Sequence, residues 1–272
     1  MPINLGQAFL LYKNQKGQVL LIVVLVMIVV LTVGLSVASR SITNLRTSTE
    51  EINSQKALSA AEAGIEQALQ TNTSIANGSF SNNTIYNTNV TEVLGTSFLL
   101  NGGNTIPKDD GVDLWLSLYS TDPARLYQNP WSGNLTIYWG DSTGSCNNAA
   151  LELTVISGTK SSPGLNKYAF DPCQARANGN HFSLASSVGA NIDIKSFSYS
   201  AAINNIASGL IIRVAPLYAG TSIGVIGSQA LPSQGFLIKS TGSSGSTQRK
   251  VNVYKGYPQL PSQYFSYGLF SP

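Results

Sequence analysis

The stretch KGQVLLIVVLVMIVVLTVGLSVASRSI, residues 16–42, decides how this chain is organised. Every residue from Val19 to Leu31 is apolar, and no charged residue occurs between Lys16 and Arg40. A helix of about 20 apolar residues is long enough to cross the hydrocarbon core of a bilayer. The stretch therefore predicts a membrane span over about residues 19–38.

The polar segment that follows the span is expected to continue the same helix. Residues 39–70 contain no proline, and their one glycine, Gly64, costs a helix only about 1 kcal/mol relative to alanine. Apolar side chains recur in this amphipathic extension every three or four residues, which places them on one stripe of a helix. The stripe consists of Leu58, Ala61, Ile65 and Leu69. We therefore predict one helix over residues 18–70, roughly 80 Å long.

Residues 71–272 are rich in Asn, Ser, Thr and Gly and predict an exported, β-rich domain. Short runs bounded by turn residues are typical of strands. These runs are Asp113–Tyr119, Asn134–Trp139, Ala150–Ser157, Ile192–Tyr199, Leu210–Pro216, Gly235–Thr241 and Arg249–Tyr254. We expect an antiparallel meander from the first three, a hairpin with a flexible polar connector (GSSGST) from the last two, and mostly loop over residues 72–104. The predicted fold class is α+β, a long N-terminal helix followed by an antiparallel β-rich domain.

The order of these segments resembles a type IV pilin precursor. In particular, KGQVLLIVVLVMIVVLTVGLSVASRSI followed by ALSAAEAGIEQAL is similar to the N-terminal domain of PilX-type minor pilins, over about the first quarter of the chain. The resemblance implies a basic leader over residues 1–17 and cleavage by a prepilin peptidase at Lys16-Gly17-Gln18. It also implies a helix held in the cytoplasmic membrane with the C-terminal domain outside. Other pilin subunits would then be its partners in a cell-surface fibre.

The chain departs from the major-pilin pattern at one position. Major pilins resemble one another in carrying a glutamate at the fifth mature position, which after cleavage behind Gly17 is Ile22 here. A carboxylate in lipid is costly and is normally kept only for a function. Its absence favours a low-copy subunit that starts or caps a fibre. Gly34 lies in a segment of small residues that permits close helix approach at the outer edge of the membrane.

Other interpretations of the N-terminus and of the function stay open. Ser36-Val37-Ala38 has the small residues that a secretory signal peptidase recognises, but a secretory apolar core is about 7–15 residues, and the uncharged stretch here is longer. Pilin-type processing is therefore the favoured hypothesis, with an uncleaved anchor and a removed signal as alternatives. The alternative function is a membrane-anchored surface binding protein, an adhesin, that is never built into a fibre.

The two cysteines, Cys146 and Cys173, lie in polar contexts after an export element. An oxidising compartment favours a disulfide between them, which would contribute roughly 3–4 kcal/mol by constraining the unfolded chain. Two separate, reduced cysteines are the alternative. A metal site is not expected, because the spacing is not CxxC and the one histidine, His181, has no partner.

The remaining patterns argue against enzymatic and nucleic-acid functions. The formal net charge is +3, and Lys13 and Lys16 of the leader contribute to it, so no phosphate-binding surface is evident. No nucleotide-binding fingerprint or nucleophile elbow occurs. Lys108–Asp113 lacks EF-hand spacing and predicts a turn. We expect no catalytic, cofactor or metal site. The aromatic-rich end, Tyr254–Phe270, is expected to pack across the β domain or the helix, with a neighbouring pilin as the alternative contact.

Overall fold

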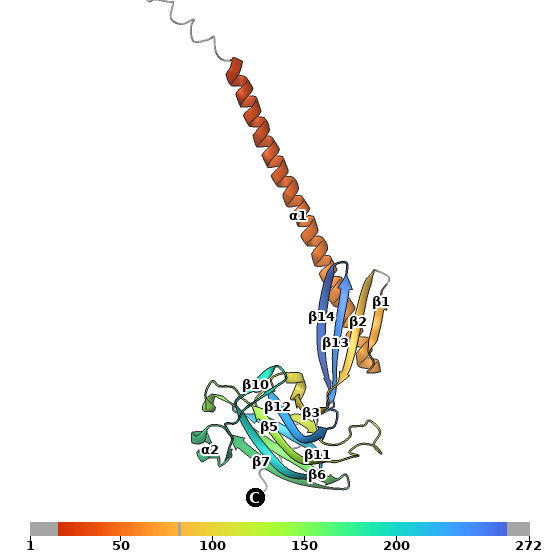
Figure 1. Cartoon of the computed structure of the whole chain (residues 1–272), viewed down its shortest axis with the longest axis vertical. Helices are drawn as coiled ribbons and strands as arrows, with labels where there is room; N and C mark the ends of the chain where they lie inside the picture. The colour runs from red at the N-terminus through yellow and green to blue at the C-terminus, as the bar shows by residue number, and fades with distance from the viewer. Residues whose placement is uncertain (1–15, 81–82, 260–272) are drawn as a thin grey trace, which may run out of the picture.

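A single long helix leads into two β lobes (Figure 1). The structure is a computed structural model that describes residues 16–80 and 83–259. Helix α1 (Lys16–Thr71) runs for 56 residues without interruption. Its bounds agree closely with the predicted range of 18–70, and the predicted α+β class is confirmed. Residues 1–15 of the predicted leader lie outside the described residues.

The C-terminal part of α1 packs against the smaller lobe, an antiparallel sheet of four strands. The strands, in spatial order, are β1 (Ile75–Ser79), β2 (Thr84–Glu92), β13 (Gly235–Ser244) and β14 (Thr247–Gly256). Strands β2 and β13 are neighbours although they are far apart in the sequence, and their ladder runs from the Phe236–Glu92 pair to the Ser244–Thr84 pair. The small sheet is therefore assembled from both ends of the β-rich region.

Everything between β2 and β13 forms the larger lobe, which is thus an insertion into the small sheet. Its sheet has eight strands in the order β3-β12-β5-β11-β6-β7-β8, and β4 pairs with β11 off this path. The bounds are β3 (Gly95–Leu99), β4 (Val112–Trp115), β5 (Trp131–Trp139), β6 (Ala150–Thr159), β7 (Ser162–Asp171), β8 (Ser183–Leu184), β11 (Tyr199–Leu217) and β12 (Ile223–Leu231). Separate elements are a hairpin of β9 (Ala190–Ile192) and β10 (Lys195–Phe197), the short helix α2 (Gln174–Asn180), and the single turns η1 (Leu100–Gly103) and η2 (Ser145–Asn147).

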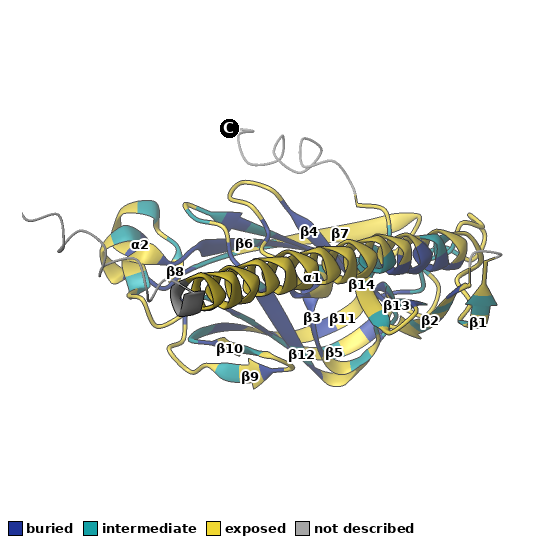
Figure 2. Ribbon diagram, turned by 90° about the horizontal axis from the view of Figure 1, so that it is seen from above, coloured by how far each residue is buried: buried dark blue, intermediate teal, exposed yellow. Residues whose placement is uncertain are grey.

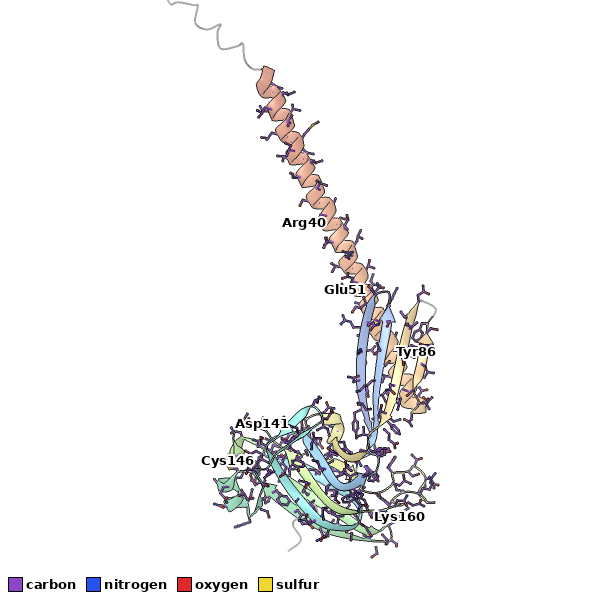
Figure 3. The ribbon with its side chains drawn as sticks, viewed as in Figure 1. Arg40, Glu51, Tyr86, Asp141, Cys146 and Lys160 are labelled. Atoms are coloured by element: carbon purple, nitrogen blue, oxygen red, sulfur yellow. A yellow bond between two sulfur atoms is a disulfide. The ribbon has the colours of Figure 1, made fainter. Side chains whose placement is uncertain are left out.

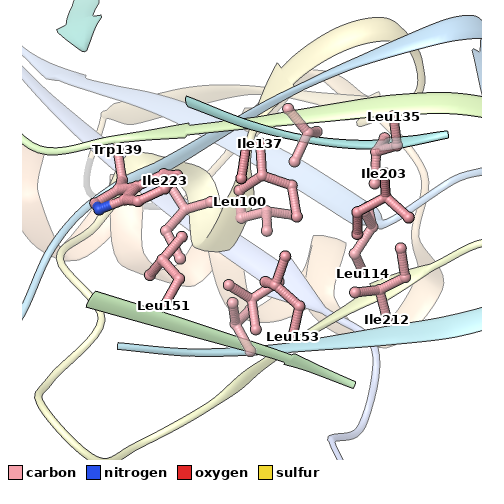
Figure 4. Close-up of a cluster of buried hydrophobic side chains, with 14 of the residues drawn as sticks. Leu100, Leu114, Leu135, Ile137, Trp139, Leu151, Leu153, Ile203, Ile212 and Ile223 are labelled. Atoms are coloured by element: carbon pink, nitrogen blue, oxygen red, sulfur yellow. The ribbon is translucent and has the colours of Figure 1, made fainter. Parts of the chain in front are cut away.

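The long strand β11 organises the larger lobe. Its first part pairs with β5 and its second part lies between β4 and β6. Register shifts after Ile203 and Ile206 interrupt the β5 ladder, and the nearby Asn205 and Ser208 adopt positive φ. Such irregularities bend a strand and increase its twist. The bent sheet encloses a fully buried apolar core that includes Ile137, Leu153 and Ile223 (Figure 4).

The ladders correct several predictions for the β region. The predicted meander is wrong, because β5 and β6 do not pair with each other and each pairs with β11. Residues 192–199 do not form one strand, since Asp193, with a φ of 52°, turns the chain between β9 and β10. Residues 72–104 contain three strands where mostly loop was expected. In GSSGST, only Gly245 and Ser246 lie between the strands, so most of the predicted flexible connector is ladder.

The two lobes join where the chain leaves and re-enters the small sheet. The backbone N–H of Val93 donates to the carbonyl of Gly235 at 2.9 Å, and the N–H of Gln234 donates back to Val93 at 2.8 Å. The buried Gln234 side chain accepts a hydrogen bond from the N–H of Trp115 and donates one to its carbonyl, both at 2.8 Å. One glutamine thus connects the small sheet to β4 of the larger lobe.

Candidate functional site

The first half of α1 is an exposed apolar rod (Figure 2). Ile22 is 59% exposed, Met27 is 69% exposed, and a β-carbon built at Gly34 would meet no atom of another element. The rod is long and apolar enough to span a membrane. Lys16, Gly17 and Gln18 form the start of the helix. An uncharged surface of this size is stable only in lipid or against other apolar surfaces, because contiguous exposed apolar patches of soluble proteins are small.

The second half of α1 is fastened to the small sheet by small residues. The buried face of the helix consists of Ala57, Ala60, Ala61, Gly64, Ile65 and Ala68. A β-carbon built at Gly64 would lie 2.6 Å from Oγ of Ser240, and one at Gly242 would lie 2.6 Å from the backbone nitrogen of Ala61. The backbones of helix and sheet therefore approach so closely that larger side chains do not fit between them.

The predicted apolar stripe is correct only in part. Ala61 and Ile65 are buried, and the half-buried Leu69 packs beside Ile65. Leu58 is 41% exposed, so its placement on the buried stripe was wrong. The close approach of β13 admits small side chains on the buried face of the helix and leaves Leu58 outside it. A recurrence of Ala and Gly at helical spacing was the signal that would have identified the true face.

Polar contacts secure both ends of this helix–sheet contact. Near its start, the Arg249 guanidinium donates from Nε to Oγ of Ser54 at 2.8 Å. Near its end, Nζ of Lys255 donates to the carbonyl of Leu69 at 2.6 Å and to the side chain of Asn72 at 2.8 Å. The last carbonyls of a helix lack intrahelical partners, so the β14 lysine satisfies one of them. Strand β14 thereby fixes where the helix ends relative to the sheet.

Cys146 and Cys173 are joined in a disulfide at the far end of the larger lobe, with their α-carbons 4.5 Å apart. Cys146 belongs to η2 and is exposed, whereas Cys173 precedes α2 and is buried. The guanidinium of Arg176 connects the same two segments, because it donates to the carbonyl of Cys146 at 3.3 Å and to that of Asn148 at 2.8 Å. The η2 loop is therefore held by the disulfide and by hydrogen bonds from the charged side chain of Arg176.

Asp171 is the buried anion behind the disulfide. Nε and Nη2 of Arg176 donate to its two carboxylate oxygens at 2.7 and 2.8 Å, and the N–H of Cys173 donates at 2.8 Å. Asn180 adds a fourth donor at 3.0 Å. Burial acts to raise the pKa of Asp171, but these hydrogen bonds outweigh burial and hold the pKa below its ordinary value. The carboxylate is therefore charged throughout the physiological range.

Two other residues singled out in the sequence, Asp113 and Tyr257, take part in contacts within the fold. Among the described residues, no group of three His, Cys, Asp or Glu side chains could hold a metal ion. Asp113, from the predicted turn, forms a buried ion pair with Arg213 at 3.0 Å. Of the aromatic-rich end, Tyr257 stacks on Tyr119 with ring centroids 4.3 Å apart, beside the junction of the lobes. Tyr264, Phe265, Tyr267 and Phe270 lie outside the described residues.

Comparison with known proteins identified no matching family model, no similar curated protein and no similar solved structure. The functional conclusion therefore rests on α1 and on the two lobes it carries.

Proposed function

We propose that this protein is a minor pilin-like subunit of a type IV pilus-like fibre, acting in fibre assembly or at the fibre tip. The observation that carries the proposal is the division of α1 into two halves. Residues 19–37 are exposed and uncharged, whereas the stripe from Ala57 to Ala68 is buried against the small sheet. One half is part of a folded domain, and the other half requires a partner outside the described chain.

The division of α1 suggests a mechanism in which one apolar surface serves two environments. In the first, the rod lies in the cytoplasmic membrane with the lobes outside. In the second, it leaves the lipid and packs among the similar helices of other subunits. Transfer between two apolar surroundings changes the hydrophobic free energy little, because the driving force depends on apolar area removed from water. No charged side chain has to be desolvated, since the rod has none between Lys16 and Arg40.

Processing by a prepilin peptidase would precede assembly. Removal of residues 1–17 between Gly17 and Gln18 would take away Lys13 and Lys16, the leader charges that precede the rod. The new N-terminus would then stand immediately before an apolar helix. Ile22 would be the fifth mature residue, so this subunit would enter the fibre without a buried carboxylate, as expected for a subunit present in few copies.

Quantitative mass spectrometry of filaments sheared from the native host tests this function. We expect the protein in the filament fraction at a small fraction of the major subunit, and fewer filaments after deletion of its gene. An Ile22→Glu variant should be recovered less in filaments than an Ile22→Leu control, because a carboxylate in hydrocarbon costs a few kcal/mol without a partner. If the protein is the most abundant subunit, the minor-pilin assignment is wrong. If the protein stays entirely in the membrane fraction, the alternative function of an anchored adhesin replaces the minor-pilin assignment.

A further inference from the structure

A polar cavity of about 500 Å³ opens in the larger lobe. Its walls come from the 140–148 loop that contains η2, from the β9–β10 hairpin, from the turn between β11 and β12, and from Thr105 in the segment between η1 and β4. Figure 3 labels Asp141 and Cys146 at this end of the lobe, which lies away from the small sheet in Figures 1 and 2. Small-molecule sites typically have volumes of about 300–1,000 Å³, so the cavity can hold a compact ligand.

Hydrogen bonds within the 140–148 wall and a disulfide hold this loop in place. The side chain of Asn148 accepts a hydrogen bond from the N–H of Asp141 at 2.9 Å and donates to the carbonyls of Asp141 and Gly144 at 3.1 and 2.9 Å. The Cys146–Cys173 disulfide and the Arg176 contacts fix the same loop from behind. A wall that is ordered in advance loses little conformational freedom on binding, which favours affinity.

The lining offers both donors and acceptors of hydrogen bonds. Nζ of Lys195 donates to Oγ of Ser222 at 2.6 Å and has further hydrogens to donate. Asp141 is an exposed carboxylate whose Oδ1 accepts hydrogen bonds from the N–H and hydroxyl of Thr143, which leaves Oδ2 as the acceptor for a ligand. The exposed hydroxyl of Thr105 makes no hydrogen bond to any described residue. The lysine and the aspartate compensate each other in charge, so the lining suits a neutral ligand whose groups both donate and accept. Hydroxyl groups have that property.

One exposed apolar side chain, that of Ile194, stands at the edge of the cavity. Ile194, in the turn of the β9–β10 hairpin, is 87% exposed, which exceeds the exposure of any large apolar side chain in the α1 rod. The neighbouring lining residue Phe197 is buried in a small apolar cluster. Packing of the fold does not account for Ile194, because an exposed side chain contributes little to a core. A ligand with an apolar C–H face beside its hydroxyl groups would cover it.

We propose that this cavity binds a neutral pyranose sugar. The sugar hydroxyls would meet Asp141, Lys195 and Thr105, and a C–H face would rest on Ile194. The proposal does not depend on fibre assembly, because a membrane-anchored protein would present the same lobe. Failure of the filament test would therefore leave sugar binding untouched, and failure of sugar binding would leave the pilin-like function untouched.

Saturation-transfer NMR on the full chain in micelles of a detergent without a sugar headgroup tests the proposal. The probes are glucose, galactose, mannose and N-acetylglucosamine. We expect saturable binding of at least one of them, with a Kd in the millimolar range that is common for weak single-site ligands. Detection of saturable binding to the native chain is the first requirement.

Matched variants then locate the binding. Ile194→Ser and Thr105→Val should each weaken it by about three- to tenfold, as expected for loss of one contact. Leu165→Ser on β7 and Thr121→Val in a distant loop should leave it unchanged, since both residues are exposed and outside the cavity. Absence of saturable binding for all four sugars overturns the proposal. Binding that the Ile194→Ser and Thr105→Val variants retain at native strength overturns it equally.

Discussion

Gly242 of β13 and Ala57 of α1 are in direct backbone contact, because a β-carbon added at Gly242 would overlap the carbonyl oxygen of Ala57. Across the same interface, Gly64 of the helix faces Thr88 and Ser240. The helix is therefore attached partly through a close contact of small residues, and Ile65 of the helix packs beside it against Ile238 of β13. The exposed rod of α1 is held in a defined direction by this one contact with the small sheet.

The first prediction concerns this contact. Gly242→Ala should lower the free energy of unfolding by about 1–3 kcal/mol, because the added methyl group forces the helix and sheet apart. Gly179→Ala in α2 is the control, since a β-carbon there meets no neighbouring atom and alanine favours a helix, so stability should stay unchanged or rise by up to about 1 kcal/mol. Thermal unfolding of both variants in detergent micelles, followed by circular dichroism, gives the comparison. Equal stability of the two variants would contradict the close approach.

The second prediction concerns the disulfide. Replacing Cys146 and Cys173 by serine should lower the stability of the larger lobe by about 2–5 kcal/mol. Trp115, Trp131 and Trp139 all belong to that lobe, so denaturant unfolding followed by tryptophan fluorescence reports on it. Insertion of α1 into the membrane should not change, because α1 packs against the small sheet and the disulfide lies in the larger lobe. Non-reducing mass spectrometry of protein from the native host should find the two cysteines linked, and two free thiols there would refute the pairing.

The third prediction concerns acid stability. The pKa of Asp171 is held below its ordinary value in the folded chain, so its contribution is complete above the unfolded-state pKa of about 3.9 and is lost as the pH falls through the lower folded-state pKa. Stability of the native chain should therefore fall steeply below about pH 4. The Asp171→Asn variant should be less stable than the native chain at neutral pH, and its stability should fall less on acidification.

The control for acid stability is Asp193→Asn, because Asp193 is exposed and asparagine tolerates its positive φ. Urea midpoints measured by tryptophan fluorescence between neutral and acidic pH decide the matter. The Asp193→Asn variant should follow the native curve. If the urea midpoint of the Asp171→Asn variant falls with pH as steeply as that of the native chain, this carboxylate does not govern acid unfolding.

The fourth prediction concerns the N-terminus. Gly17→Val should leave the leader attached, because the proposed peptidase requires a small residue before the cut, whereas Gly34→Val should be processed normally. N-terminal sequencing of protein from the native host should find Gln18 first. A mature protein that starts at Ser39 would instead support a secretory signal peptide and remove the rod on which the pilin-like proposal rests.

The local pattern of the sequence was sufficient to predict α1. A long run without proline or charge, followed by an uninterrupted polar segment, determines a continuous helix, because helical hydrogen bonds join residues only four apart. Individual strands such as β5, β6, β13 and β14 were also predicted near their true positions, since alternation and turn residues are local signals. Pairing of Cys146 with Cys173 was favoured by the expected export of the domain, with two reduced cysteines as the alternative, and the structure has the disulfide.

Long-range contacts decided the rest, and no local pattern contains them. The insertion of β11 between β5 and β6 joins residues such as Ile203 and Leu135, whose pairing depends on the whole sheet. The cavity beside Asp141 exists only because four segments that are far apart in the sequence meet there. Leu58 was misplaced for the same reason: its own sequence neighbourhood fits a buried stripe, but the close approach of β13 selects Ala57 and Gly64 for that face. Side-chain pattern therefore determined the helix, and the distance between packed backbones determined which of its faces is buried.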